Sequence, residues 1–548
     1  MDAKQLREQA DDLFSKRSTL TLLWQEIADN FYVERADFTL KRTIGTDYAA
    51  GMMTSYPPLC RRDLGDQLGS MLRPTNKQWA HMTTKDERRE THEARMWLEM
   101  ADIAMRRAMY DPDAMFTRAT KEGDHDFASF GQCVISIELN RHANAMLYRC
   151  WHLRDVAWME NQDGKICFIS RKWKPTVRDL SRLFPGKLDK KIEDKIAKTP
   201  FAEAPVMHMV VEADMYDDKA KGKPYWSIYY DCDNQKVIEA TPVRSMIYVI
   251  PRWQTVSGSQ YAFSPATVIA LPEARLLQAM TLTLLEAGEK AVNPPVIATT
   301  NVVKSDIELF AGGRTWVDED YDEKLGEALR PLTQDLRGLP LSKEMRMDTS
   351  GILQSCFYLN KLRPFTPTSD PQMTAFQAGQ IVADYIRQAL PLFEPMEMDY
   401  NGAICKETFL LLNRNGTFGS PFERPKVLQN IEADIQFQFE SPLHDAIKAQ
   451  KGHKLLEMSQ LIAQAMALDK SVANLPDAKV ALRDALDGIG VPPKWVRSET
   501  QVMELDEAQQ AEIEAQKLLG AMGQGAVIAK NLGQAQAAAG AAPAIALG

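Results

Sequence analysis

The chain has 548 residues, of which 65 are basic and 74 acidic, so its formal net charge is -9. A protein that grips DNA over a broad face neutralises phosphates with lysine and arginine and is normally basic, so this charge argues against tight, extended DNA binding, although an acidic wall can let DNA slide. Hydrophobic residues make up 45% and charged residues 25%, as in an ordinary folded protein, and at roughly 150 residues per domain the length predicts about three or four units.

The cysteines and the N-terminus indicate where the protein is made. Seven cysteines form no C-x-x-C pair, and their number is odd. This pattern argues against a disulfide framework or a zinc site and fits a reducing cytosol. The first residues, MDAKQLREQADDLF, are charged and amphipathic, unlike a signal peptide. No uninterrupted apolar run approaches about 18 residues, so we expect no membrane-spanning segment.

The first part of the chain, residues 1–109, has mainly helical periodicity. Apolar residues recur there every three or four positions, which places them on one face of a helix. The clearest series are Leu6, Ala10, Leu13 and Phe14, then Leu20, Leu23, Trp24 and Ile27, and finally Leu64, Leu68 and Leu72. Pro74 follows the last series and predicts the end of that helix.

Residues 132–250 change to the alternating pattern of half-buried strands. The dipeptide Asp163-Gly164 predicts a hairpin turn, and Val177–Phe184 predicts a helix that interrupts the series. The region is therefore predicted to be α+β with a mostly antiparallel sheet. The predicted strands are Gln132–Leu139, Met146–Cys150, Trp158–Asn161, Ile166–Ile169, Val206–Val211, Tyr225–Tyr230, Val237–Glu239 and Met246–Ile250.

Two helices are predicted in the middle of the chain. Ser264-Pro265 predicts the start of the first, because serine caps helices and proline is favoured at the first helical position. Pro272 predicts a kink or a restart, and the run ends at Asn293-Pro294-Pro295. Residues 296–340 are predicted to form short strands and turns. Residues 341–359 then form the second helix.

The segment Lys361–Pro371 contains three prolines and is predicted to be an irregular loop. A long helical pattern follows it, is broken at Pro391 and Pro395, and ends at Asn415-Gly416, a natural C-cap. Further helices are predicted near 443–468, 475–487 and 504–519. From Ala521 to Gly548 the only charged residue is Lys530, so this tail is predicted to be disordered or to pack only within an assembly.

Three polar clusters are candidates for chemistry, and for each we favour a structural interpretation. His92-Glu93 begins an H-E-x-x-H pattern, but Met96 stands where the second zinc ligand belongs, so we expect a solvated helix. The segment Gly123–Asp126 (GDHD) suggests acid–base or metal chemistry, but we favour a polar turn between a helix and a strand. The acidic run Asp318–Asp320 suggests a cation site, but we favour a solvated loop.

Known catalytic motifs are also missing from the sequence. There is no phosphate-binding G-x-x-x-x-G-K-[ST] loop and no G-x-S-x-G nucleophile elbow. The sequence therefore predicts no catalytic residue, no cofactor and no metal.

Four segments in this order resemble the portal, or head-to-tail connector, proteins of short-tailed bacteriophages. Each motif is degenerate, and the family's common T-A-x-E start is here Thr374-Ala375-Phe376-Gln377, so the order of the segments carries the resemblance, which covers nearly the whole chain. The segments are LCRRDLGDQLGSMLRPTNKQWAHMTT, YAFSPATVIALPEARLLQAMTLTLLEAGEKAVNPPV, MTAFQAGQIVADYIRQALPLFEPMEMDYNGAICKETFLLLNRNG and SPLHDAIKAQKGHKLLEMSQLIAQA.

The resemblance implies an α+β, predominantly helical portal fold whose copies form a closed ring, typically a dodecamer. It implies this division of the chain: a wing at 1–263, stem helices at 264–291 and 341–358, a clip at 292–340, a channel (tunnel) loop at 359–371, wing and crown helices at 372–500, and a C-terminal crown or tail at 501–548 that is of low complexity from 521.

The resemblance also implies a function. The ring would occupy one vertex of the capsid in the virion after synthesis in the host cytoplasm, and double-stranded DNA would pass through it without sequence preference. Its partners would be the terminase motor, the tail adaptor, and the capsid and scaffolding proteins, with no membrane. Lys361 and Arg363, on the proline-rich loop, are candidates to meet DNA phosphates in the channel. Ion pairs with carboxylates at the ring interface are an equally open role for them.

Two other functions compete with this one. A non-ring structural protein, such as an internal virion or tail component, would share the composition but would not form a ring with a DNA-sized hole. A packaging ATPase–nuclease is disfavoured by the missing phosphate loop.

Overall fold

The computed structural model describes residues 2–362 and 396–440 with short gaps, and a few positions beyond them. The chain divides into two compact units, one formed by Met1–Glu87 with Leu98–Ile447 and the other by Arg88–Trp97 with Lys448–Gly548. The fold below is that of the first unit. The gaps are 44, 75–76, 86–90, 217–221, 293, 299–301, 304, 309–313, 323, 325–326, 328, 332–337, 421–423, 430–431 and 433–434, and the positions beyond 440 are 458–459, 461–462, 464, 477, 480–482, 486, 502 and 505.

Three helices open the chain, where the sequence predicted them. They are α1 (Ala3–Lys16), α2 (Ser18–Phe31) and α3 (Tyr56–Leu72). The predicted apolar faces are buried, as the helical spacing requires, since Leu6 and Ala10 on α1 and Leu64 on α3 have almost no exposed surface. A short 3-10 turn, η1 (Val33–Arg35), follows α2.

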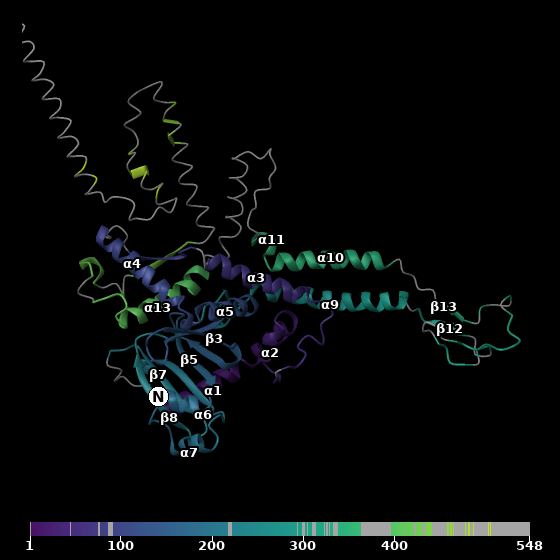
Figure 1. The fold of residues 1–548 in the computed structure, drawn as a ribbon, viewed down its shortest axis with the longest axis horizontal. Helices are drawn as coiled ribbons and strands as arrows, with labels where there is room; N and C mark the ends of the chain where they lie inside the picture. Colours follow the sequence, from purple (N-terminus) through teal and green to yellow (C-terminus); the bar gives the residue numbers. More distant parts are fainter. Residues whose placement is uncertain are drawn as a thin grey trace, which may run out of the picture. The chain divides into compact units, whose positions relative to one another are not determined.

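Two antiparallel sheets form the centre of the unit (Figure 1). The larger sheet is a meander in the order β4-β5-β6-β7-β8, and the smaller has the order β3-β2-β9. The hairpin predicted at Asp163-Gly164 is confirmed in the larger sheet. It joins the antiparallel strands β4 and β5, and Gly164 in its turn has a positive φ of 71°. The strands are β2 (Val134–Leu139), β3 (Met146–Trp151), β4 (Val156–Glu160), β5 (Ile166–Trp173), β6 (Val206–Glu212), β7 (Tyr225–Asp231), β8 (Lys236–Val243) and β9 (Tyr248–Val249).

The sheet buries its apolar residues against helices. Leu6, Ala10 and Leu13 of α1 share a core with Phe168 on β5 and Met209 on β6. A second core lies between the sheet and the helices α6 (Val177–Leu183) and α7 (Lys190–Lys198). The sequence predicted α6 but not α7, whose charged residues obscure its short apolar face.

Two further elements of the first unit were missed or misassigned. The segment Gly123–Asp126 is not a turn but lies inside the helix α5 (Phe116–Phe130). The strand β14 (Ile435–Phe439) was not predicted, and it pairs antiparallel with β1 (Ala80–Thr84). Its partner lies about 350 residues away along the chain, a pairing that no local pattern reveals.

The two predicted middle helices are present and contact one another (Figure 1). The first, α9 (Pro265–Val292), corresponds to the prediction 264–291 and continues through Pro272. The second, α10 (Gly338–Cys356), begins three residues before the predicted 341–358 and ends two residues before its end. Between them, β12 (Val296–Ala298) and β13 (Leu329–Pro331) form a small antiparallel ribbon.

The segment after α10 corrects one prediction. The loop was predicted from Lys361, but Leu359–Leu362 form a short helix, α11. The predicted C-cap at Asn415-Gly416 is confirmed, because α13 (Ala403–Arg414) ends there and Gly416 has a φ of 77°. Most of the predicted helices between 372 and 395 and after 441, and the tail from 521, lie outside the described residues.

The remaining elements are short, except for α4. They are α4 (His92–Met109), η3 (Pro112–Ala114), η4 (Leu153–Asp155), α8 (Ala213–Tyr216), β10 (Gln254–Thr255), β11 (Ala262–Phe263), the π-helical turn η6 (Glu397–Gly402) and η8 (Lys426–Leu428).

Candidate assembly surface on the helices α9 and α10

The start of α9 is fixed to the end of α5. The Ser264 hydroxyl donates to the Ala128 carbonyl and the Thr267 hydroxyl donates to the Ser129 carbonyl, each at 2.7 Å. Carbonyls in the last turn of a helix have no partner within the helix, so these side chains satisfy groups that would otherwise be buried unpaired. Gly131 ends α5 with a φ of 73°, and a Cβ there would overlap the Phe263 carbonyl. The two helices can therefore meet only with glycine at this position.

The next turns of α9 are held by the N-terminal segment. The Gln278 side-chain oxygen accepts from the amides of Met53 (2.7 Å) and Thr54 (3.0 Å), and its nitrogen donates to the Thr54 carbonyl (3.0 Å). Arg275 forms an ion pair with Glu26 on α2. These contacts clamp the first half of α9 to the body of the unit.

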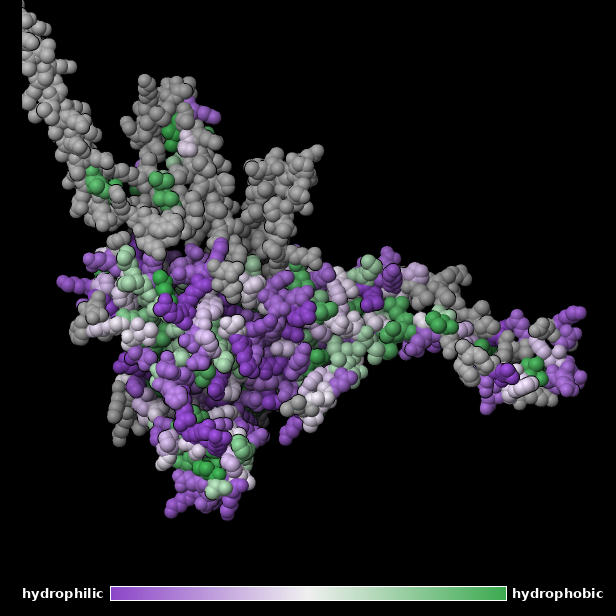
Figure 2. All heavy atoms as spheres, in the orientation of Figure 1, coloured by the Kyte–Doolittle hydropathy of each residue, from purple (hydrophilic) through white to green (hydrophobic). Residues whose placement is uncertain are grey.

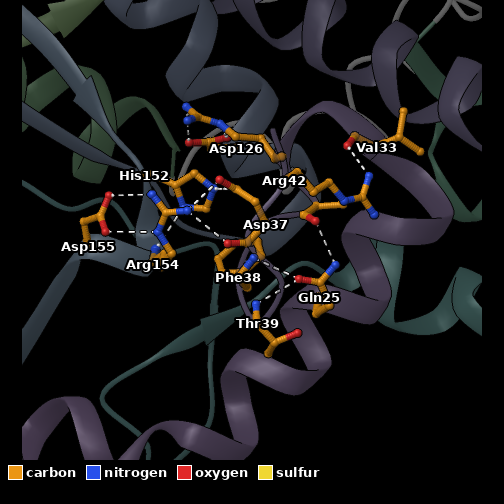
Figure 3. A network of polar contacts seen from close by, with 12 residues as sticks. Gln25, Val33, Asp37, Phe38, Thr39, Arg42, Asp126, His152, Arg154 and Asp155 are labelled. Carbon is orange, nitrogen blue, oxygen red and sulfur yellow. Dashed lines mark hydrogen bonds and ion pairs between the residues drawn. The ribbon is translucent and has the colours of Figure 1, made fainter. Parts of the chain in front are cut away.

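The segment after α2 is itself fixed by a network of polar contacts (Figure 3). The buried Gln25 amide donates to the Ala36 carbonyl (2.9 Å) and accepts from the amides of Phe38 (2.8 Å) and Thr39 (3.0 Å). One side chain thereby pins an irregular segment that has no strand partner. This leaves α2 in a defined position beside α9.

Asp37 joins the same segment to the turn between β3 and β4 (Figure 3). Its carboxylate lies 2.7 Å from His152 Nε2 and 2.5 Å from Arg154 Nη1. Burial alone would raise the pKa of Asp37, but its contacts with His152 and Arg154 lower it to about 2. The carboxylate is therefore ionised throughout the neutral range and links the two segments.

The polar cluster Gly123–Asp126 is a set of ion-pair and hydrogen-bond partners for arginines. Asp124 pairs with Arg73 of the segment after α3, and Asp126 accepts two hydrogen bonds, of 3.0 and 3.1 Å, from Arg35. His125 lies 3.0 Å from Arg61, and burial together with that cation lowers its pKa. Because both carboxylates are neutralised within the fold, the cluster has a structural role. Among the described residues, no group of three possible metal ligands occurs.

Both the clamped first half of α9 and the turns beyond it expose apolar side chains. The residues that face its own chain are Ala266, Thr267, Ala270, Leu271, Ala274, Leu277 and Thr281. The large apolar residues that face outward are Val268, Ile269, Leu276, Leu282, Leu285 and Val292, joined by Met345, Met347 and Ile352 on α10. Ile269 is 63% exposed and Met347 67%, values usual for charged residues rather than apolar ones. Figure 2 shows this apolar surface along the helix pair.

A groove of about 800 Å³ runs between the two helices. Apolar side chains make up most of its wall, with one carboxylate and one thiol. It is lined by Ile269, Met347, Asp348, Gly351, Ile352, Ser355, Cys356 and Tyr358. Among these lining residues no group of three possible metal ligands occurs, and the groove offers an apolar depression to a protruding side chain.

By length and composition alone, α9 could also cross a membrane. Its most apolar window of 18 residues has a mean hydropathy of 1.4, and 28% of that window is buried. The sequence analysis missed this property because Glu273 and Arg275 interrupt the apolar run. A single helix of this kind is weak support for a membrane segment, since a helix that packs on protein has the same composition.

The predicted site residues are only partly described. Lys361 belongs to α11, whereas Arg363 lies outside the described residues. Glu319 and Asp320 are exposed, as predicted for a solvated loop, and Glu93 is exposed on α4. The surface residues that the sequence did not single out are Met347 and Ile352, because helical periodicity marks apolar positions without showing which of them are covered.

Comparison with known proteins identifies the family. The family model described as "Bacteriophage head to tail connecting protein" matches residues 3–496. The portal protein of Salmonella phage epsilon15 is 23% identical over 326 residues, which are 58% of this chain and 56% of that protein, so the chain spans a little over half of that relative's length. Because the family match covers most of the sequence, this chain belongs to the bacteriophage head-to-tail connecting protein family, as its resemblance to phage portals predicted.

Proposed function

We propose that the chain is a structural subunit of a closed ring at one vertex of a phage capsid, through which double-stranded DNA is packaged and later ejected. Family membership supports this role, and the observation that carries it is the pair of exposed apolar flanks on α9 and α10. The role needs no catalytic residue, cofactor or metal.

The positions of the exposed residues favour a ring over a two-fold dimer. Ile269 and Leu276 are seven residues apart and share one flank of α9, whereas Val268 and Leu282 share another, about 100° away around the helix. A two-fold dimer uses the same surface on both copies and would leave one flank exposed. A head-to-tail contact covers one flank of each copy with the other flank of the next, and a ring closes the series.

Covering the exposed apolar side chains of α9 and α10 would stabilise the contact between subunits. Covering a leucine or isoleucine side chain contributes about 1.5–3 kcal/mol relative to leaving it exposed. The groove beside Ile352 and Cys356 offers a depression for a neighbour's side chain, so the contact combines burial with shape. Part of this gain offsets the entropy lost on association.

Within the ring, the division of the chain follows the family resemblance. Residues 1–263 form the wing, 264–291 and 341–358 the stem, 292–340 the clip, 359–371 the channel loop, 372–500 the wing and crown helices, and 501–548 the crown or tail. The clip docks the terminase motor first and the tail adaptor later, and the wing meets capsid and scaffolding proteins. Twelve copies are expected, located in the virion.

DNA would meet this ring as a sliding polyanion. A net charge of -9 per chain disfavours a fixed grip, because each neutralised phosphate stabilises one position. Lys361 and Arg363 would supply the few cations that touch the backbone, or else would pair with carboxylates between subunits.

Electron microscopy of the purified full-length protein, combined with one pair of variants, tests the proposal. We expect class averages with a central hole of at least about 20 Å, wide enough for a DNA duplex. Leu276→Glu on α9 should abolish rings, because it places a charge in the contact. Leu183→Glu on α6 is the matched control, since both leucines are 45% exposed.

The outcomes are distinct. Rings that persist in Leu276→Glu would remove α9 as the contact, and a wild-type protein that stays monomeric or forms open filaments would favour the non-ring structural protein. Monomers in both variants would show that the substitutions act on folding, which circular dichroism checks independently.

A further inference from the structure

The ribbon of β1 and β14 stands where the chain leaves the first unit. The boundaries between the two units fall after Glu87, after Trp97 and after Ile447. The first follows β1 by three residues, the second lies within α4, and the third follows β14 by eight residues. Every covalent connection to the C-terminal unit therefore starts from this ribbon or from the helix beside it.

A buried carboxylate attaches the ribbon to α4. Asp102 on α4 is 4% exposed, and its two oxygens lie 3.0 and 2.9 Å from the backbone nitrogen of Met82, which donates to them. Met82 sits in the middle of β1, opposite Phe437 of β14. The amide of a central strand residue is thus held by a side chain of the neighbouring helix, and the ribbon is anchored at its midpoint.

His81 connects this carboxylate to the end of β14. Its Nδ1 lies 3.9 Å from Asp102 and its Nε2 lies 3.4 Å from Glu440. The Glu440 amide also donates to the Trp79 carbonyl at 2.8 Å, which continues the ladder past the strand. One imidazole therefore stands between two carboxylates that come from different elements.

The charges around Asp102 are mostly of its own sign. Glu99 on α4 is acidic, and Cys405 on α13 is a buried thiol whose pKa is raised by burial. The His81 ring lies between Asp102 and Glu440, which follows β14. Burial and the nearby Glu99 raise the pKa of Asp102 to about 7, although the Met82 amide and His81 act against this rise. A proton on Asp102 removes a buried charge.

We propose that Asp102, His81 and Glu440 form a proton-controlled clasp that holds the β1–β14 ribbon on α4 at mildly acidic pH and loosens it at mildly alkaline pH. When Asp102 loses this proton, its carboxylate is buried near the acidic Glu99, and detaching the ribbon lets water solvate it. The clasp thereby sets how firmly the β1–β14 ribbon is held within the first unit, independently of whether the protein forms a ring.

Hydrogen exchange of the full-length protein, read by mass spectrometry, measures the clasp directly. The protection factor, which is the ratio of intrinsic to observed exchange rate, corrects for the pH dependence of the exchange chemistry. Between about pH 6 and about pH 8 we expect protection in peptides covering β1 and β14 to fall about tenfold, because the attached state loses its bound proton over that interval. Peptides from β6 and β7 should keep their protection.

Asp102→Asn is the decisive variant, since an amide keeps the shape and the acceptor for Met82 but cannot ionise. It should make protection of the ribbon independent of pH, at or above the wild-type value near pH 6. Asp113→Asn, the same change at an exposed site, should behave as the wild type does. His81→Gln should lower ribbon protection near pH 6 without altering β6 and β7, and it serves if Asp102→Asn does not fold.

Two results would overturn the clasp. One is a wild-type ribbon whose protection changes less than about twofold over this interval, which is too little for a linked proton. The other is a tenfold change that persists in Asp102→Asn, because a different group would then control the ribbon.

Discussion

The helices α5 and α9 place their unusual residues in opposite ways. In α5, carboxylates are buried, and arginines from the same chain neutralise each of them. In α9, large apolar residues are exposed, and no described part of the same chain covers them. The buried charges of α5 are paired within one subunit, whereas the exposed apolar residues of α9 are covered only when another molecule packs on them. A residue of the wrong polarity for its position therefore indicates either a partner within the fold or a partner outside it.

The largest loss of unfolding free energy should come from Arg73→Leu, which leaves the buried Asp124 of α5 without its cation. Breaking a buried ion pair on one side costs about 3–5 kcal/mol of unfolding free energy. Chemical denaturation measures the loss. Arg118→Leu, which removes an exposed pair with Glu122 on the same helix, should cost at most about 1 kcal/mol. Equal losses in the two variants would mean that the Asp124 pair is not a requirement of the fold.

The contact between the end of α5 and the start of α9 is tested by Gly131→Ala. The substitution combines backbone strain at a φ of 73° with overlap onto the Phe263 carbonyl. Strain of this kind alone costs about 1–3 kcal/mol. Gly164→Ala isolates that strain, because its φ is 71° and nothing lies within 4 Å of an added Cβ. We expect the melting temperature of Gly131→Ala to fall well below that of Gly164→Ala, and similar values would show that the helices can separate at little cost.

The ion pairs of Asp37, which hold the segment after α2, should contribute less to stability than the two features above, and their contribution should depend on pH. The pKa of Asp37 is lowered to about 2, so its ion pairs stabilise the fold above the ordinary aspartate pKa near 3.8 and are lost as the pH falls from about 4 to about 2. Allowing for partial exposure, this contributes about 1–2 kcal/mol. Thermal unfolding of Asp37→Asn should show lower stability at neutral pH and a flatter acid limb than the wild type. If Asp37→Asn loses stability at acidic pH as the wild type does, other carboxylates cause that loss.

The smallest effect on the isolated subunit should come from Leu282→Ser on the exposed flank of α9. Substitutions at exposed positions usually change unfolding free energy by less than about 0.5 kcal/mol. Assembly, followed by analytical ultracentrifugation, should nevertheless weaken clearly. A variant that loses folding stability but assembles normally would reverse the interpretation of this flank.

The sequence was sufficient for elements that have a regular period. The apolar series on α1 and α3, the alternation of the sheet strands and the Ser264-Pro265 helix start each reflect a local rule, and the structure follows them. It was insufficient where a partner is distant. GDHD was interpreted as a turn because its carboxylates look solvated, and only Arg35 and Arg73, far along the chain, make a helix there stable. β14 was missed for the same reason.

The candidate surface was predictable only as a helix. The Ser264-Pro265 start and the Asn293-Pro294-Pro295 end predicted α9 as a helix, but such signals do not distinguish a face covered by the same chain from one that another molecule covers. That distinction needs the positions of α5, α2 and α10 around the helix.

The geometry of α9 also has a mechanical consequence. A continuous helix of 28 residues is a stiff rod about 42 Å long, at 1.5 Å per residue. Its base is held by Ser264, Thr267 and Gln278, while its far end leads into the β12–β13 ribbon and contacts α10. Such a rod acts as a lever whose pivot is the junction with α5. A force applied at the ribbon therefore produces a torque at that junction, where the backbone of Gly131 lies in close contact with Phe263.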